Sequence, residues 1–449
     1  MRVHPKKALS RVQVLFMETF GMGRAMALTA LILVSAIVLF AVFWFFHSAP
    51  PSTITISTGP EGSIFQTYAK RYSAILAKQR VTLKIIPSEG SLENLKRLLD
   101  PHFHVDVAFV QGGIAGDLPI GKLVSLGSVT YEPLIIFYRS PKQMELLSEF
   151  AGHRLAIGPE GSGTRSLALV LLKANGIEPG GTTALLGMDA DEAANELAQG
   201  KIDAAFMMGD SASAQVMLKL LRTPSIHMYN FTQADAYTRR FVYLNKLPLP
   251  EGSIDFGQNI PAHDVWLVGP TVELVARPDF HPALSDLLIE AATQVHGKAG
   301  LLKRQGEFPA PLEHEFRISD EAARFYKSGK SFLYRSLPFW LASLANRILV
   351  AFVPMIVLLI PVLRFIPIIY RWRVKMRIYR WYRLLLVLEQ ELTASSGPKS
   401  RETLHAQLDK IEENVNKMKV PASFGDQFYV LRQHIKFVHS RLMENTQEH

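Results

Sequence analysis

Two glycine-rich segments repeat the same five residues and could bind an anion. Residues 59–63 and residues 158–162 both read GPEGS, and the second copy continues with Gly163 and Thr164. Each copy lies between a strand-like run and a helix-like run. At such a junction glycine lets the backbone approach a ligand, and the unpaired N–H groups at the start of the helix attract a carboxylate or a phosphate. We therefore expect two lobes facing each other across one cleft; a shared turn geometry without a ligand is the alternative.

The glutamates of the two copies, Glu61 and Glu160, are candidates for acid–base chemistry or for a cation site. The alternative is that each carboxylate points to solvent at its turn. The sequence has no HExxH zinc motif, no Walker phosphate loop and no GxSxG nucleophile elbow. His102 and His104 alternate on one extended segment without a third ligand, and the chain has no cysteine. We expect no catalytic residue, no metal and no cofactor, and an exported enzyme is the weaker hypothesis.

The positive charge of the chain lies at its two ends. The 449 residues carry a net charge of +9. Residues 1–24 and 364–449 together carry +10 and Arg347 adds one charge, so residues 47–338 are left at −2. A basic domain is the electrostatic requirement for binding nucleic acid, and the middle of the chain does not meet it. We expect no nucleic-acid partner.

A run of 22 uncharged residues, 25–46, is long enough to cross a membrane as a helix. Five basic residues precede it, whereas residues 47–60 contain no Lys or Arg. By the positive-inside rule, residues 1–24 form a cytoplasmic segment and the following domain is exported. A cleaved signal peptide is the alternative, but its apolar region is usually only about 7–15 residues long. The pattern predicts an uncleaved anchor in a bacterial inner membrane.

A second apolar run, residues 339–363, is interrupted by a single charge at Arg347. Basic and aromatic side chains alternate over the next twenty residues, which is typical of the lipid headgroup region and of a cytoplasmic stop. Four basic residues between Arg324 and Arg335 weaken the charge difference on the outer side. Two transmembrane helices would place both termini in the cytoplasm, with residues 364–449 as a basic helical region. We expect contact with membrane lipid.

Strand-like and helix-like runs alternate between the two apolar runs and predict α/β layers with largely parallel sheets. We expect an exported domain over residues 52–335. Its first lobe covers about 52–139 and 245–335, and its second lobe covers about 140–244. A chain that leaves the first lobe, forms the second and returns has its cleft where it crosses, close to the carboxyl ends of the strands.

The polar tail beyond residue 383 has helical patterning. Apolar residues recur at helical spacing at Leu404, Leu408, Ile411, Val415 and Met418. Breaks are expected at residues 395–398 and 420–421. We expect a small helical hairpin, whose apolar face packs within the chain or binds a partner.

Five short motifs, taken in order, resemble a known family. They are STG…GS at 57–63, GSLENL at 90–95, DVAFVQ at 106–111, GSGT at 161–164 and GKIDA at 200–204. The series resembles the TAXI family of TRAP-transporter solute receptors over roughly residues 52–310. The resemblance implies a type II periplasmic-binding-protein fold that closes on a small solute, often a carboxylate or an amino acid.

The resemblance also implies a set of ligand-binding residues. These are Thr58, Gly59, Gly62, Ser63, Tyr68, Gly90, Ser91, Gln111, Gly161, Ser162, Gly163 and Thr164. The expected protein is a membrane-tethered receptor that serves a TRAP-type permease. The second hypothesis, a sensor that signals through its helical tail to a cytoplasmic partner, stays open.

Overall fold

The computed structural model describes residues 24–47, 49–330, 332–394, 398–418, 420 and 424–447. Its described residues belong to two compact units, an α/β domain of residues 50–345 and an α-helical unit formed by the chain on either side of it. The cytoplasmic segment expected at residues 1–24 lies outside the described residues except for Arg24. Most of the breaks expected near residues 395–398 and 420–421 also lie outside them.

The first lobe of the α/β domain is built on a six-stranded sheet. Along the sheet the strands follow the order β13-β4-β12-β3-β1-β2. The central strands β1 and β3 are parallel, whereas β12 is antiparallel to β3 and β4. The elements are β1 (Thr53–Ser57), α3 (Ile64–Ala77), β2 (Thr82–Ile86), α4 (Ser91–Leu99), β3 (Val107–Gln111), β4 (Val124–Tyr131), β12 (Thr271–Ala276), α9 (Pro282–His296), β13 (Arg317–Ile318) and α10 (Asp320–Ser328).

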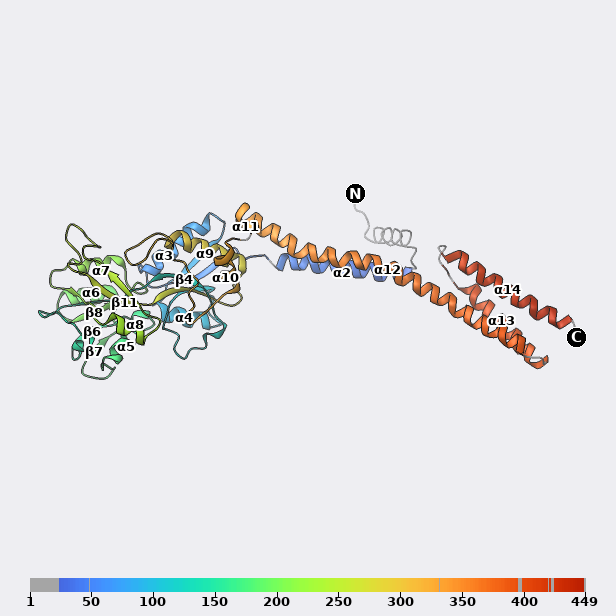
Figure 1. The fold of residues 1–449 in the computed structure, drawn as a ribbon, viewed down its shortest axis with the longest axis horizontal. Coiled ribbons are helices and arrows are strands. Elements are labelled where there is room, and N and C mark those ends of the chain that lie inside the picture. Colours follow the sequence, from blue (N-terminus) through green and yellow to red (C-terminus); the bar gives the residue numbers. More distant parts are fainter. Residues whose placement is uncertain are drawn as a thin grey trace. The chain divides into compact units, whose positions relative to one another are not determined.

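The second lobe is built on a five-stranded sheet in the order β7-β6-β8-β5-β9. Here β6 is parallel to β7 and β8, and β5 is antiparallel to β8 and β9. Its elements are β5 (Ile135–Tyr138), β6 (Arg154–Ala156), α5 (Gly163–Ala174), β7 (Ala184–Leu186), α6 (Ala190–Ala198), β8 (Ala204–Met207), α7 (Ala214–Leu221), β9 (His227–Met228) and α8 (Ala234–Arg240). Figure 1 shows the second lobe in green beside the blue elements of the first.

The two sheets repeat one topology. In the first sheet β1 lies between β2 and β3, and the antiparallel strand β12 lies next to β3. In the second sheet β6 lies between β7 and β8 in the same way, and the antiparallel strand β5 lies next to β8. β5 crosses into the second sheet and β12 crosses back into the first. The repeated GPEGS segments therefore occupy equivalent places, between β1 and α3 and between β6 and α5. The structural repeat explains the sequence repeat.

The chain crosses between the two lobes at other residues than the lobe boundaries expected from the sequence. The first crossing falls between β4 and β5, before residue 135, whereas the expected boundary followed residue 139. The second falls between β11 (Val265–Gly269) and β12, and β11 pairs with β10 (Asn245–Leu249) as a small separate sheet. Residues 245–269 were expected to belong to the first lobe. A short apolar run predicts a strand, but the sheet that it joins is decided by tertiary packing.

Each lobe has its own apolar core. In the first lobe Phe65, Tyr72 and Phe109 are buried between α3 and the sheet. In the second lobe Phe150 and Phe231 are fully buried against β5, β8 and their helices. All five residues of β3 are buried, which is typical of a central strand covered on both faces. Rigid lobes of this kind can hold their connecting loops in a fixed geometry.

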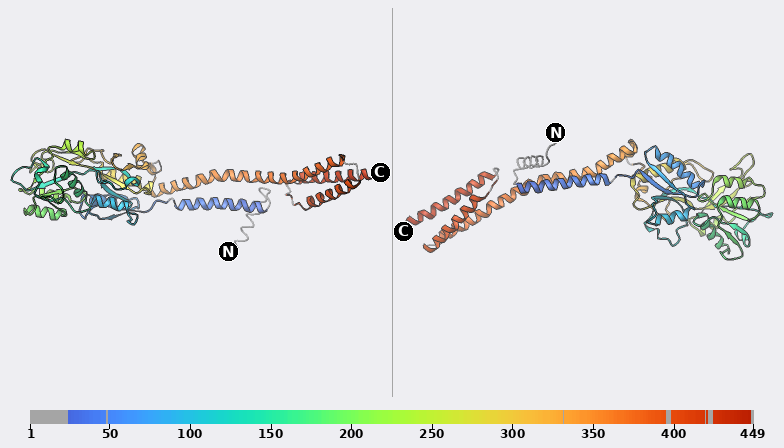
Figure 2. Two further views of the ribbon diagram at one scale, coloured as in Figure 1. Left: turned by 90° about the horizontal axis from the view of Figure 1, so that it is seen from below. Right: turned by 180° about the vertical axis from the view of Figure 1, so that it is seen from behind.

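The α-helical unit contains α2 (Arg24–His47) and most of α12 (Phe339–Ala394). α12 has 56 residues and continues through Pro354, Pro361 and Pro367. The two helices lie side by side in every view, and the ring of Phe45 contacts that of Phe352 with centroids 6.1 Å apart (Figure 2). Among the described residues, one helix, 339–391, is long and apolar enough to cross a membrane, and 31–47 is a shorter apolar helix. The two expected transmembrane helices are therefore not confirmed.

The tail forms a bundle of three helices. α13 (Pro398–Lys417) and α14 (Gly425–Gln447) pack with the second half of α12. Leu404, Leu408 and Val415 are buried in this contact. The expected hairpin is present as α13 and α14, and its apolar face is covered by α12 within the chain.

Candidate ligand site at the junction of the two lobes

The serines of the two GPEGS segments cap the helices that follow them. The Ser63 hydroxyl oxygen accepts from the backbone N–H of Gln66 at 3.2 Å, and the Ser162 hydroxyl oxygen accepts from that of Arg165 at 3.1 Å. An N-cap side chain satisfies one of the unpaired N–H groups at a helix start. The two hydroxyls, which the sequence suggested for orienting a ligand, thus have the same structural role in both lobes.

The carboxylate of Asp210 lies where an anionic ligand was expected. It accepts from the backbone N–H of Ser91 at 3.3 Å, from that of Gly163, and from the hydroxyl of Thr164 at 2.8 Å. Ser91 begins α4 in the first lobe, whereas Gly163 begins α5 in the second. The starts of two helices therefore converge on one carboxylate, as their dipoles favour. That carboxylate belongs to the chain itself and joins the two lobes.

Asp210 is fully buried, and burial raises the pKa of its carboxyl group. The hydrogen bonds from Thr164, Gly163 and Ser91 oppose that rise because they stabilise the ionised form. These donors therefore form an anion-binding site, and the group that occupies it is the side chain of Asp210.

Further hydrogen bonds cross between the lobes at the same place. The N–H of Ile64, at the start of α3, donates to the carbonyl of Gly209 at 3.1 Å. The side-chain amide of Gln111 donates to the carbonyl of Gly163 at 3.0 Å. The N–H of Glu93 donates to the carbonyl of Gly161 at 2.9 Å. The described structure is therefore a closed arrangement in which loops of both lobes pair directly.

Gly90 is required by this close approach, and Gly163 leaves room for a side chain of the other lobe. Gly90 has a φ of +136°, and a Cβ there would overlap the carboxylate of Asp210. A Cβ at Gly163 would overlap the side-chain amide of Gln111. Because no other residue fits these positions without displacing its neighbour, the glycines allow contact between the lobes.

A cavity of about 340 Å³ lies beside these contacts, and both lobes line it. We call it the junction cavity. The first lobe contributes α3, β4, β12 and the loop after α9, and the second contributes α7 and the loop after β8. Its lining residues are Ile64, Phe65, Tyr68, Thr130, Tyr131, Glu132, Pro133, Gly209, Met217, Val272, Gly300, Leu301, Leu302 and Lys303. A largely apolar pocket with a few polar groups is the usual form of a small-molecule site.

Glu132 is the acidic group of the junction cavity and lies on the first crossing segment. Its side chain is buried, and neither carboxylate oxygen makes a hydrogen bond to a described residue. Burial and the charge of Asp210 raise its pKa well above the usual value, and the nearby backbone N–H of Asp210 opposes the rise. The N–H of Glu132 donates to the carbonyl of Pro270 at 2.9 Å, so the two crossing segments fix its position.

The structure distributes the expected ligand residues over two places. Gly90, Ser91, Gln111, Gly163 and Thr164 surround or adjoin the carboxylate of Asp210. Tyr68 instead lines the junction cavity, where its ring contacts that of His296 with centroids 4.5 Å apart.

The remaining expected residues stabilise the loops. The Thr58 hydroxyl donates to the carbonyl of Gly59 at 3.3 Å. A Cβ at Gly59 would overlap the carbonyl of Asp210. Gly62 has a φ of +83° and donates its N–H to the Gln66 side chain at 2.9 Å. Gly161 has a φ of +91°. Contact with a solute stays a prediction for all twelve residues.

Sequence reasoning missed Asp210 and Glu132. A signal existed for Asp210, because it follows the carboxyl end of the buried strand β8, just as Gln111 lies at the carboxyl end of the buried strand β3 in the other sheet. The flanking Gly209 and Ser211 instead suggested an ordinary turn. Glu132 gave no local signal, because an acidic residue between two strands is usually exposed in a loop. Its burial follows from the crossing of the chain.

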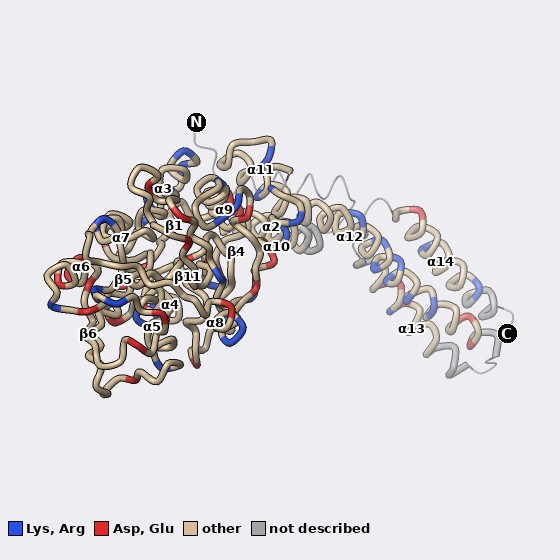
Figure 3. The backbone as a smooth tube through the Cα atoms, turned by 60° about the vertical axis from the view of Figure 1, so that its left-hand side comes forward, with Lys and Arg blue, Asp and Glu red and all other residues tan. Residues whose placement is uncertain are grey.

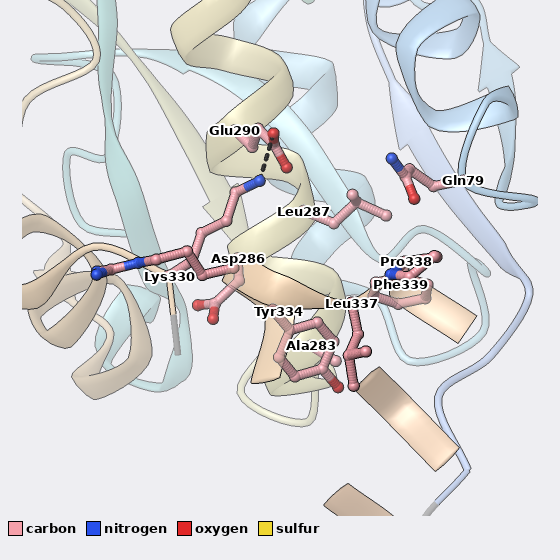
Figure 4. Close-up of a pocket in the computed structure, with 11 residues that line it drawn as sticks. Gln79, Ala283, Asp286, Leu287, Glu290, Lys330, Tyr334, Leu337, Pro338 and Phe339 are labelled. Atoms are coloured by element: carbon pink, nitrogen blue, oxygen red, sulfur yellow. Dashed lines mark hydrogen bonds and ion pairs between the residues drawn. The ribbon is translucent and has the colours of Figure 1, made fainter. Parts of the chain in front are cut away.

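A second cavity of about 200 Å³ lies between α9 and residues 330–339 of the same domain (Figure 4). Three of its four charged side chains are paired, and the fourth, Arg335, is exposed and donates to the backbone carbonyl of Ser328 at 3.4 Å. The ammonium of Lys330 contacts the Glu290 carboxylate at 2.5 Å, and the Arg324 guanidinium holds both oxygens of Asp286 at 2.8 and 2.9 Å. Paired charges leave less for a ligand to bind, so the junction cavity is the better candidate.

Among the described residues, one group of three side chains could coordinate a metal ion. Asp409, Glu412 and His439 bring their ligand atoms within 4.8 Å of one another in the three-helix bundle. Asp409 is exposed, and acidic clusters on helix surfaces are common without an ion. The group carries no argument about function.

Comparison with known proteins supports the type of fold. Residues 56–262, somewhat less than half of the chain, match the model of the NMT1-like family. The match and the topology together describe a mixed α/β domain resembling the periplasmic-binding-protein fold. The TAXI family expected from the motifs is not confirmed. No curated protein matches this chain.

Solved structures with similarity to this chain include three bacterial proteins. The periplasmic aliphatic sulphonate binding protein SsuA from Escherichia coli has 13% identity and a TM-score of 0.35 over 55% of this chain and 74% of its own. The ligand binding component of an ABC-type import system from Staphylococcus aureus has 14% identity and a TM-score of 0.34 over 54% and 72%. A lipoprotein from Treponema pallidum has 16% identity and a TM-score of 0.32 over 54% and 90%. At these values none of the three identifies a ligand.

Proposed function

We propose that the chain is a membrane-tethered, extracytoplasmic receptor that binds a small solute between its lobes. The observation that carries this proposal is the junction cavity, which both lobes line at the place where the chain crosses. A site shared by two lobes couples binding to closure, because the closed form contacts the solute on both sides.

The exposed surface of α2 and α12 supports tethering. Phe43, Phe46, Val357 and Ile360 are each more than 60% exposed. Apolar patches of this extent are unfavourable in water and are typical of helices that contact lipid. Lys and Arg gather on the following part of α12 (Figure 3), where anionic headgroups at the cytoplasmic surface would attract them. The proposed topology has two spans, an exported α/β domain and both termini in the cytoplasm.

Delivery of the solute to a partner permease, of the TRAP type or another, is the favoured role. Two spans are too few to form a transporter, and a tether keeps the receptor close to its permease. A specific observation also favours sensing: α12 runs unbroken from Phe339 at the end of the α/β domain into the three-helix bundle. A continuous helix could carry a ligand-dependent displacement to a cytoplasmic partner.

The sequence predicted a solute with a carboxylate, and in this structure the carboxylate of Asp210 would compete with it. The amide and hydroxyl donors that would bind its acidic group are occupied by Asp210. A solute carboxylate would have to displace that side chain.

Mass spectrometry of small molecules retained by the full chain tests the receptor proposal. The chain would be purified in lipid nanodiscs and its bound molecules released by denaturation. We expect one solute class at close to one molecule per chain. If the folded chain retains nothing and binds nothing from a metabolite mixture, the receptor proposal fails.

A further inference from the structure

We propose that the solute of the junction cavity carries a protonated amine on an apolar body, and that the carboxylate of Glu132 binds the amine. The inference rests on the proposed receptor function and adds the chemical class of the solute. Its geometric basis is that Glu132, whose carboxylate is buried, is one of the residues lining a cavity that is otherwise mainly apolar, including Ile64, Phe65, Met217 and Leu301.

Glu132 makes no ion pair and no hydrogen bond of normal geometry with a described residue, although the nearby N–H of Asp210 opposes the rise of its pKa. This is costly for a buried carboxylate. Both of its oxygens are inaccessible to water and make no hydrogen bond in the described part of the chain. A buried acidic group is expected to be paired, neutralised or used in binding. An ammonium group supplies both the opposite charge and the N–H donors that this carboxylate lacks.

The charged and titratable groups around Glu132 favour a cation over an anion. Asp210 lies close enough that its charge raises the pKa of Glu132. Tyr68 faces the same space, and the charge of Glu132 adds to burial in raising its pKa. A solute anion placed here would meet two acidic side chains.

The cation of the cavity, Lys303, is held away from Glu132. Its ammonium donates to the backbone carbonyl of His296 at 2.7 Å. Burial lowers the pKa of Lys303, and Glu307 opposes this shift. Lys303 therefore does not supply the missing ion pair in this structure.

A bare metal ion fits the lining less well than an amine. Calcium and magnesium require about six or more oxygen ligands, whereas the side chains around Glu132 are mostly hydrocarbon. An organic ammonium needs a few acceptors, and its carbon skeleton gains from the apolar wall.

Binding of an amine would release a proton. Burial and the charge of Asp210 raise the pKa of Glu132 well above its usual value, so a proton competes with an ammonium group for this carboxylate. An arriving ammonium stabilises the carboxylate form and lowers that pKa. Binding is therefore expected to release up to one proton and to strengthen as the pH rises, until the amine itself deprotonates.

The test offers the full chain in nanodiscs a pool in which each carbon skeleton is present as a primary amine, an alcohol and a carboxylate. Skeletons from butyl to phenylethyl would be included, and retained compounds would be identified by mass spectrometry. We expect the amine of the best-fitting skeleton to bind about tenfold or more tightly than its alcohol. Titration calorimetry in two buffers of different ionisation heat then measures the proton released.

Glu132→Gln should remove the preference for the amine and the proton release, while the alcohol binds as before. Glu313→Gln is the matched control, because Glu313 is exposed and does not line the junction cavity. Thermal unfolding of both variants checks that the fold is retained.

Each outcome decides between the two proposals. Preference for the carboxylate or the alcohol, or an amine preference that survives Glu132→Gln, overturns the inference about the amine and leaves the receptor standing. Retention of no compound of the pool by the folded chain overturns the inference about the amine, and the receptor proposal fails as well if the chain also retains nothing from a metabolite mixture.

Discussion

At the scale of single residues, the molecule is defined by acidic side chains that folding has buried. Asp210 accepts hydrogen bonds from both lobes. Glu132 and Glu273 make none of normal geometry with a described residue, although the N–H of Asp210 and the hydroxyl of Ser125 lie near enough to oppose the rise of their pKa values. A buried carboxylate that accepts hydrogen bonds from two lobes holds them together. A buried carboxylate with few donors has a raised pKa, because burial disfavours its ionised form.

Removal of the Asp210 side chain should destabilise contact between the lobes. Asp210→Ala leaves the N–H groups of Ser91 and Gly163 buried without an acceptor, at a cost of about 2–4 kcal/mol in unfolding free energy. Asp210→Asn should cost less, because its oxygen can face the two amides while its nitrogen donates to the Thr164 hydroxyl. Denaturant unfolding of the full chain measures both.

The control for these variants is Asp117→Ala, at an exposed position. An equal loss of stability in Asp117→Ala and Asp210→Ala would contradict the role assigned to Asp210.

Glu273 should make the α/β domain less stable as the pH rises. Burial raises its pKa from 4.5 to about 7. Because the folded value lies above the unfolded one, the contribution of Glu273 is fully present below pH 4.5 and is lost as the pH rises to about 7. The shift corresponds to about 3 kcal/mol.

His296 titrates in the opposite sense, because burial lowers its pKa from 6.5 to about 3. The contribution of His296 to the unfolding free energy is therefore lost as the pH falls from 6.5 to about 3. The difference in unfolding free energy between the parent and Glu273→Gln isolates the glutamate, and we expect this difference to change by about 3 kcal/mol between pH 4.5 and 7. Glu313→Gln, at an exposed site, should show no such change.

At the scale of elements, local patterns predicted what the segments are but not where they join. The repeated GPEGS segments were found from sequence because each needs glycine at positive φ and a serine that caps a helix. The alternation of strands and helices was predicted as well. The sheet that β5 joins was not, because an apolar strand has the same composition in either lobe.

The tertiary contacts of the site were also beyond local patterns. The starts of α3 and α5 were expected to bind the anion of a solute, whereas the starts of α4 and α5 converge on the carboxylate of Asp210. That arrangement depends on how the lobes meet. The tail illustrates the same limit: its apolar stripe indicated a packed face, and its third partner, α12, was not identified.

The N-caps should contribute stability independently of any ligand. Ser162→Ala removes the acceptor for the N–H of Arg165 and should lower the unfolding free energy by about 1 kcal/mol. Ser225→Ala, at an exposed position, is the control. Urea unfolding of the two variants compares them, and equal stability would show that the cap contributes nothing.

At the scale of the whole molecule, the proposed topology separates a solute-binding domain from a helical bundle by a membrane. The chain has no cysteine, so single cysteines can report their own accessibility. Lys173→Cys lies in the α/β domain and Lys417→Cys in the three-helix bundle, and the parent side chains are 73% and 71% exposed.

A membrane-impermeant maleimide should label Lys173→Cys in intact spheroplasts. It should label Lys417→Cys only after the membrane is permeabilised. Labelling of both in intact spheroplasts, or of neither, would contradict the two-sided topology.

The central claim is that the solute occupies the junction cavity, and a variant that fills this cavity tests it most directly. Met217 lines the cavity from α7, whereas its neighbour Leu218 is 36% exposed. The measurement is the amount of small molecule retained by the full chain, compared between Met217→Trp and Leu218→Trp. The account predicts that Met217→Trp loses the solute and that Leu218→Trp retains it as the parent does. Full retention by a folded Met217→Trp protein would place the solute elsewhere and contradict the account.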